Sequence, residues 1–379
     1  MKFPKIKRVT KEQKVEKQLN ITKEVRKIEQ RFEFLRIGLA LIIALSVVLF
    51  IIALVSDDPL FAIREMLLGP FSSLRRMGNV IEAAIPITFT GLAITMVFKT
   101  HRFNLAADSA FYLGAMVTLM VGMYSPLPPY ATIVIGLIAG FIAGGIVGFI
   151  PALINFKFGA NELVVSLMLN YIVSFYVKYL LNYVVRDPYS ASLQSYPMQE
   201  GINLGNLVSG TRIHYGLILM VIVVIVAFIV LYKTKWGYAL RMTGLNEKFS
   251  KYSGIKVAGV VMLAQAIGTG IAGFGGAVEM MGLYTRFRWL ESPGYGWDGV
   301  IIATLARGNP AAVPFAALFL AYIRTGADIL NRTTNIPAEI ISLVQAIIIT
   351  LIAAQAFLSK QKQKQIVKTS TVVEQAGGQ

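Results

Sequence analysis

The segment Lys233–Gly254, KTKWGYALRMTGLNEKFSKYSG, is the long polar and basic stretch inside an otherwise apolar run from Phe34 to Leu358. It holds five basic side chains against one acid, Glu247. Basic residues in short loops mark the cytoplasmic side of a membrane protein, and the scattered apolar residues and glycines favour a short helix. We therefore expect a short helix on the cytoplasmic surface between two spanning helices. On spacing alone, a solvated basic loop that only fixes topology is the simpler interpretation.

The composition places the chain among membrane proteins. Of its 379 residues, 55% are hydrophobic and 15% are charged, against roughly 25% charged residues in soluble domains. A soluble protein cannot bury that much apolar surface. We expect an all-α fold, a polytopic integral membrane helical bundle of about ten spans that includes broken or half helices.

The net charge of +16 is concentrated at the two ends of the chain. Next to a hydrophobic domain, such basic residues are typical of positive-inside anchors near anionic headgroups. Membrane lipid, and no nucleic acid, is therefore the expected partner. The chain has no cysteine, which excludes disulfides and thiolate metal sites. Its two histidines, His101 and His214, fall at predicted span ends on opposite faces, so we expect no metal site.

The chain divides into three regions. Residues 1–35 form a charged cytoplasmic segment, residues 36–358 the transmembrane domain, and residues 359–379 a cytoplasmic tail. The predicted spans are 36–55, 79–98, 104–123, 130–150, 161–184, 215–232, 255–283, 296–306, 311–330 and 336–358. The stretch 296–306 is too short to cross alone at about 1.5 Å per residue, so we expect a half helix there. Ten spans place both termini and the basic loops on the cytoplasmic side.

Two patterns predict how the spans pack. The ladder Gly136/Gly140/Gly144 is a seam of small residues that allows close helix contact. The turns Phe103-Asn104 and Trp297-Asp298 each follow a glycine-bearing helix, a faint internal repeat of the kind found in transporters with broken helices.

Four stretches resemble a known family. They read GYALRMTGLN…YSGI from Gly237, RFNLAADSAFYLGA from Arg102, FGANELVVSLMLNY from Phe158 and GYGWDGVIIATLARGNP from Gly294. Taken in the order of the chain, they resemble permease subunits of ATP-binding-cassette importers, in the nucleoside and simple-sugar branch related to ribose and branched-chain amino acid permeases. In that family the stretch from Gly237 is the coupling loop that docks into a separate ATPase. The resemblance implies this role for Gly237, Arg241, Gly244, Asn246 and Gly254.

The resemblance also implies the partners of the chain. These are cytoplasmic ATPase subunits that bind ATP and magnesium, a second permease chain that is expected to differ from this one, and an extracellular substrate-binding lipoprotein. The location would be a bacterial cell membrane. The chain itself contains no G-x-x-x-x-G-K-[ST] motif, so we expect it to be a transport subunit without enzymatic activity and without a cofactor of its own.

Polar side chains near mid-membrane are candidates for a solute pathway. Counted along the spans and their turns, they are Asn104, Asp108, Asn170, Gln265, Trp297, Asp298 and Gln345. Mostly neutral donors and acceptors suit a nucleoside or a simple sugar. Equally, each residue can simply form an interhelical hydrogen bond, worth about 0.6 kcal/mol.

Two other functions remain open on the sequence. An ion-coupled secondary carrier would use Asp108 or Glu279 in its pathway, and a membrane scaffold would transport nothing. Arg324 and Asp328, four residues apart on one helix, are expected to form a local ion pair.

Overall fold

The computed structural model describes residues 58–334, together with Ser46, Phe50, Ala53 and Ala346. The fold given below is that of one compact unit, Leu60–Pro337, as far as its residues are described. Gln345, the predicted spans 36–55 and 336–358, and the terminal segments 1–35 and 359–379 lie outside the described residues, apart from the isolated positions just named.

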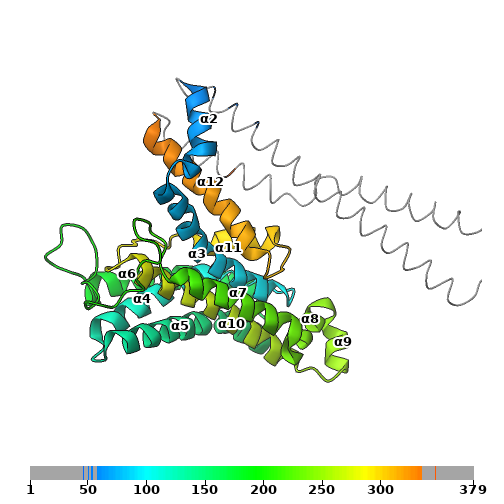
Figure 1. The fold of residues 1–379 in the computed structure, drawn as a ribbon. Helices are drawn as coiled ribbons and strands as arrows, with labels where there is room; N and C mark the ends of the chain where they lie inside the picture. The colour runs from blue at the N-terminus through cyan, green and yellow to red at the C-terminus, as the bar shows by residue number, and fades with distance from the viewer. Residues whose placement is uncertain (1–45, 47–49, 51–52, 54–57, 335–345, 347–379) are drawn as a thin grey trace, which may run out of the picture. The chain divides into compact units, whose positions relative to one another are not determined.

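The described part of this unit is built from helices (Figure 1). They are α2 (Pro59–Leu68), η1 (Gly69–Phe71), α3 (Leu74–Phe98), α4 (Ala107–Tyr124), α5 (Pro129–Phe158), α6 (Glu162–Tyr179), η2 (Leu180–Val184), α7 (Gly216–Lys233), α8 (Lys235–Leu245), α9 (Glu247–Tyr252), α10 (Val257–Leu283), α11 (Tyr295–Leu305) and α12 (Val313–Thr333). Among these residues, extended pairing is limited to two isolated bridges, Arg186↔Ser195 and Asn206↔His214. The all-α class is therefore confirmed.

Six helices within residues 58–334 are long and apolar enough to cross a membrane: α3, α5, α6 continued by η2, α7, α10 and α12. The predicted span 104–123 begins later than expected, because α4 starts at Ala107. The predicted half helix 296–306 is present as the 11-residue α11. A polytopic helical bundle with a half helix is thus confirmed. The total of ten spans is not confirmed, because eight of them were predicted within residues 58–334 and α4 and α11 are not among the six helices that qualify there.

Helix α10 contacts α3, α4 and α5, and its glycines let the helix backbones touch. A Cβ atom on Gly273 would lie 2.3 Å from the carbonyl oxygen of Gly140, and one on Gly144 would lie 2.6 Å from that of Thr269. Small residues at four-residue spacing provide such close approach in membrane helices. The predicted seam on α5, which also includes Gly136, is confirmed, and α10 is its partner.

Helix α4 begins inside the bundle. After α3 the chain turns back inward as a non-helical segment, and the Asn104 side-chain amide donates to the carbonyl oxygen of Gly148 at 3.1 Å. Gly148 lies ten residues before Phe158, the last residue of α5. At 1.5 Å per residue, this point is about 15 Å from the end of α5.

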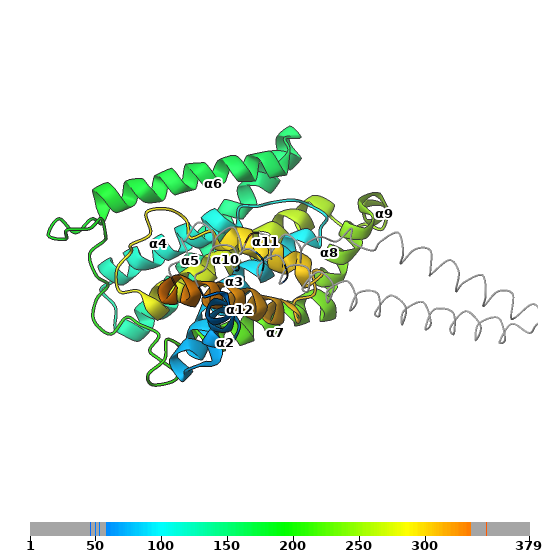
Figure 2. The same cartoon turned by 90° about the horizontal axis from the view of Figure 1, so that it is seen from above.

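Helix α11 begins at the same place and runs the opposite way. The backbone N–H of Gly296, in its first turn, donates to Oδ1 of Asp108, in the first turn of α4, at 3.0 Å. In Figure 2, α4 extends toward the end of the bundle with the loop 185–215, and α11 toward the end with α8 and α9. We call these the loop end and the basic end. Two half helices thus meet at their N-termini, as in broken-helix repeats.

Candidate functional site

The basic segment forms two short helices that join α7 to α10. The side chain of Thr234 accepts a hydrogen bond from the Gly237 N–H at 3.0 Å and starts α8. The Asn246 side chain accepts from the Phe249 N–H, also at 3.0 Å, and starts α9. Both are N-caps, which hold a helix start in place. The expected single helix is therefore a capped pair, divided at Asn246.

The glycines of this segment fit α8 closely against the bundle. A Cβ atom on Gly237 would lie 2.1 Å from the carbonyl oxygen of Val230, and one on Gly244 would lie 2.0 Å from that of Lys99. Gly254 has a φ of +82°, a conformation that favours glycine. All three predicted coupling glycines therefore have a steric reason to be glycine.

Arg241 lies on the bundle side of α8 rather than in solvent. Its guanidinium is 5.2 Å from the centre of the Tyr232 ring, a cation–π arrangement. Lys99 lies close enough to interact with it electrostatically, and burial together with the Arg241 charge lowers the pKa of the Lys99 amine. Two basic groups are thus held near one another where α8 meets the turn after α3.

Three large apolar side chains of this helix pair are exposed among the exposed charged residues Glu247, Lys248 and Lys251. The side chains of Leu245, Phe249 and Tyr252 are 77%, 54% and 92% exposed. Apolar side chains gathered on the surface of a polar segment are typical of a protein interaction site.

A chain of polar contacts leads from α9 into the bundle. Nη2 of Arg102 lies 2.8 Å from the Glu247 carboxylate at the start of α9, and Nη1 lies 3.8 Å from the carboxylate of Glu162 at the start of α6. Glu162 accepts from the Gln265 side-chain amide of α10 at 2.8 Å. Gln265 in turn accepts from the Asn104 amide at 2.6 Å. We call these five residues the polar relay.

Exposure falls along the polar relay. The Glu247 side chain is 53% exposed, that of Arg102 25% and that of Glu162 5%, while Gln265 and Asn104 are fully buried. Residues that are far apart in sequence therefore connect the surface helix α9 to the segment that starts α4.

The predicted residues Asn104, Asn170 and Gln265 are brought together around the non-helical segment before α4. The Asn170 amide donates to the carbonyl oxygen of Leu105 at 3.0 Å, and the Leu105 N–H donates to Ser166 Oγ at 3.1 Å. Backbone groups that lack a helical partner are satisfied in this way. These side chains hold the non-helical backbone in place inside the bundle.

Asp108 and Asp298 meet at the junction of the half helices, and each has a partner. Asp108 accepts from the Gly296 N–H, as described above, while Asp298 accepts from Arg324 Nη2 on α12 at 2.6 Å. Arg324 therefore forms its close ion pair with Asp298 on α11 and not the expected close pair with Asp328, on which its charge acts only from longer range. The Trp297 side chain is 51% exposed beside this junction.

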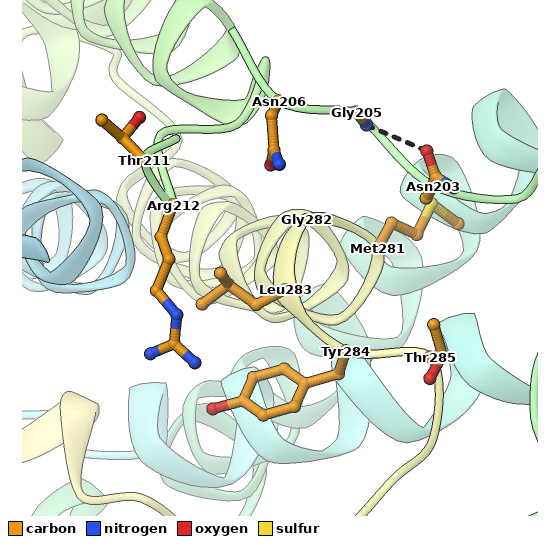
Figure 3. A pocket seen from close by; sticks show the side chains of 10 residues that line it. All are labelled: Asn203, Gly205, Asn206, Thr211, Arg212, Met281, Gly282, Leu283, Tyr284 and Thr285. Atoms are coloured by element: carbon orange, nitrogen blue, oxygen red, sulfur yellow. Dashed lines mark hydrogen bonds between the residues drawn. The ribbon is translucent and has the colours of Figure 1, made fainter. Parts of the chain in front are cut away.

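A cavity of about 350 Å³ opens at the loop end, between the loop before α7 and the end of α10 (Figure 3). It is lined by Asn203, Gly205, Asn206, Thr211, Arg212, Met281, Gly282, Leu283, Tyr284 and Thr285. Sequence reasoning did not find it, and the only available signal was Arg212, the single arginine in the polar stretch 188–214.

Sequence reasoning also missed the roles of Arg102, Glu162 and Glu247. Each was visible as a charged residue, but their pairing joins residues 60 and 145 positions apart, and one sequence gives no sign of such pairing. Among the described residues, no three histidine, aspartate or glutamate side chains are placed to hold a metal ion.

Comparison with known proteins gives a consistent result. The profile of the family described as "Branched-chain amino acid transport system / permease component" matches residues 76–353. The guanosine ABC transporter permease protein NupP of Bacillus subtilis is 28% identical, with 76% of this chain and 83% of that protein covered. The nucleoside ABC transporter permease protein NupB of Lactococcus lactis is 24% identical, with coverage of 84% and 91%.

A third relative is named for a different substrate, glucose. The glucose ABC transporter permease protein TsgB13 of Haloferax volcanii is 26% identical, with 80% of this chain and 83% of that protein covered. No solved structure matches the chain.

Proposed function

Because the chain belongs to the family of permease components of branched-chain amino acid transport systems, we propose that it forms the membrane pathway of an ATP-driven importer for nucleosides. Two relatives with the name of nucleoside or guanosine permease support this solute class. The chain is a multi-pass membrane transport subunit and not an enzyme. A carrier driven by ions alone and a non-transporting scaffold are set aside, because the family consists of permease components.

In this proposal the basic end faces the cytoplasm and both termini lie there. The coupling residues Gly237, Arg241, Gly244, Asn246 and Gly254 shape a helix pair that docks into an ATPase subunit, which binds the ATP and magnesium. The uncovered side chains of Leu245, Phe249 and Tyr252 supply the docking surface. A second, non-identical permease chain and a substrate-binding lipoprotein outside a bacterial cell membrane complete the importer.

The observation that carries this proposal is the polar relay. A movement of α9 on ATP binding pulls on Arg102 through Glu247. Through Glu162, Gln265 and Asn104, the same movement reaches the segment that starts α4. Since the start of α4 contacts the start of α11, both half helices shift together. We expect this shift to switch the pathway beside Asp108, Trp297 and Asp298 between its two open states.

Docking is tested by a pair of matched variants. Tyr252 on α9 is 92% exposed, and Tyr189 at the loop end is 93% exposed. Tyr252→Glu places a charge on the docking surface and should reduce co-purification of the ATPase at least about tenfold. Tyr189→Glu should leave it unchanged. If the ATPase co-purifies equally well with both variants, α9 is not part of the ATPase interface.

The solute class is tested by uptake. Labelled nucleosides and simple sugars are supplied to the reconstituted importer with and without ATP. We expect ATP-dependent uptake of nucleosides. Uptake of glucose and not of nucleosides would favour the second candidate, a simple-sugar permease, to which the name of the Haloferax relative points.

A further inference from the structure

Helix α6, continued by η2, carries exposed aromatic side chains along one face. These side chains are between 52% and 79% exposed, and they belong to Tyr171, Phe175, Tyr176, Tyr179 and Tyr183. Four of them follow at four-residue spacing, which places them on one side of a helix, and Tyr176 lies beside them. We call these five residues the aromatic stripe.

The aromatic stripe reaches the middle of the membrane. Helix α6 begins at Glu162 and η2 ends at Val184. At about 1.5 Å per residue, Tyr171 lies roughly 14 Å from the start of α6, which is close to half the thickness of the hydrocarbon core, about 15 Å. Tyrosines normally gather at the two membrane–water interfaces. That preference explains Tyr183, near the end of the span, but it does not explain Tyr171.

Neighbouring spans expose different side chains at the same depth. In the middle of α5 the exposed residues include Ile142 and Ile146, and in the middle of α7 they include Ile222 and Ile225. Such aliphatic side chains suit contact with lipid tails. The Tyr171 hydroxyl forms no hydrogen bond among residues 58–334, and lipid tails offer it none, which costs free energy. The aromatic stripe is therefore poorly suited to lipid.

The position of α6 favours a neighbour from another chain. Helix α6 packs on α4 and α5, and Figure 2 shows it on one side of the bundle, with α2 and α12 on the other. The chain leaves the described part at Asp58, just before α2, and at Thr334, just after α12. Neither of these two points lies beside α6.

The composition and size of the aromatic stripe are those of a protein interface. Aromatic residues are enriched in the contacts between proteins. A buried aromatic side chain covers about 150–250 Å², so five that are half or more exposed would supply roughly 500–800 Å² of contact area. A stable interface buries about 800 Å² on each partner. The stripe can therefore form most of one side of such an interface.

We propose that the aromatic stripe is the contact surface for the second permease chain of the importer. The rings pack against a spanning helix of that chain, and its polar side chains or carbonyl oxygens accept hydrogen bonds from the hydroxyls of Tyr171 and Tyr176. This inference rests on the proposed function, which calls for a second and non-identical permease chain, and it assigns the helix on which that chain packs.

Photo-crosslinking in the complete importer tests the contact. The photoreactive residue p-benzoylphenylalanine, which resembles tyrosine in shape, replaces Tyr171 or Phe175 in the stripe. The matched controls carry it in place of Ile142 or Ile225, which are both 53% exposed near the middle of their helices. Under ultraviolet light we expect the two stripe positions to form an adduct with the second permease chain and the two control positions to form none. If the stripe positions behave as the controls do, or react with a copy of this chain, the proposal is wrong.

Co-purification gives a second measurement. Tyr171→Ala combined with Phe175→Ala should lower the amount of second permease chain that co-purifies at least about tenfold, because buried aromatic anchors carry much of the binding energy of an interface. Ile142→Ala combined with Ile146→Ala removes two exposed side chains of α5 and should leave that amount unchanged. Equal amounts with both double variants would overturn the proposal.

The two levels of the argument can fail separately. If wild type retains the second permease chain but the stripe positions form no adduct with it, only the assignment of α6 is wrong. If wild type retains no second permease chain at all, the proposed function has failed in that part, and the inference fails with it.

Discussion

Arg102 and Glu247 lie 145 residues apart in the chain, yet their side chains form an ion pair of 2.8 Å. Arg102 belongs to the segment between α3 and α4, and Glu247 begins α9. The pair therefore ties the helix that we expect to face the ATPase to the segment that enters the bundle. Since both side chains are partly exposed, the pair contributes only about 0.2–1 kcal/mol to stability. Its effect on coupling can be measured separately from its effect on folding.

Removing the Glu247 charge should uncouple transport from ATP hydrolysis. We expect Glu247→Gln to keep ATPase activity in the complex but to lower the solute moved per ATP by roughly fivefold or more, because α9 then moves without Arg102. Hydrolysis and uptake are measured in the same vesicles. Glu291→Gln, which breaks a comparable surface pair with Lys178, should leave the ratio unchanged. A normal ratio in Glu247→Gln would contradict the polar relay.

The buried part of the polar relay should matter for stability as well. Gln265→Leu removes the partner of both Asn104 and Glu162. One hydrogen-bonding atom of each residue is left buried without a partner at a cost of about 1–3 kcal/mol, so we expect a loss of roughly 2–6 kcal/mol in the free energy of unfolding. Thermal unfolding in detergent measures it. A variant as stable as wild type would show that water or a rearranged neighbour replaces the amide.

The close fit of α8 makes Gly244 intolerant of a methyl group. In Gly244→Ala the new Cβ would lie 2.0 Å from the Lys99 carbonyl oxygen, whereas a Cβ on Gly259 of α10 meets no atom within 4 Å. We expect Gly244→Ala to cost about 1–3 kcal/mol and Gly259→Ala to be neutral or slightly stabilising. Melting temperatures of the two variants provide the comparison, and equal values would mean that α8 does not pack on the α3 turn.

Local patterns in the sequence were enough to predict the helices, the half helix 296–306 and the glycine seam on α5. Each of these depends on residues close together in one segment, such as the apolar run of a span or small residues four positions apart. A short helix within residues 233–254 was also predicted, although its division by the Asn246 cap was not. Its coupling to an ATPase stays a prediction. A cap depends on backbone angles that composition does not determine.

Partners across the bundle could not be predicted in the same way. Arg324 has an acid one turn away at Asp328, so the local pair was the natural expectation. Arg324 pairs with Asp298 instead, because Asp298 is 4% exposed. An unpaired charge at this buried position would cost far more free energy than one at the exposed Asp328. The site therefore depends on tertiary packing that brings α11 against α12, which no single segment encodes.

This choice of partner gives a direct prediction. Asp298→Asn leaves Arg324 without its buried partner and should cost about 3–5 kcal/mol in the free energy of unfolding. Asp328→Asn should change it by less than about 0.5 kcal/mol, as for an ordinary exposed position. Chemical or thermal unfolding of the two variants decides between them. If Asp328→Asn were the less stable of the two variants, Asp328 and not Asp298 would be the main partner of Arg324.

His214 provides a prediction of pH dependence. It is fully buried just before α7, and its Nδ1 accepts a hydrogen bond from the Gly216 N–H at 3.1 Å. Burial lowers the pKa of His214 from 6.5 to about 4. Between these two values the unfolded chain carries the proton and the folded chain does not, so the free energy of unfolding falls as the pH falls.

The slope reaches about 1.4 kcal/mol per pH unit. Between pH 7 and pH 5 we expect His214 to account for a loss of about 2 kcal/mol, and His214→Gln, which keeps a polar side chain of similar size, should lose that part of the slope. Unfolding of both proteins is followed across this range. Parallel curves would contradict the assignment, since they would mean that His214 binds its proton equally well in the folded and unfolded chains.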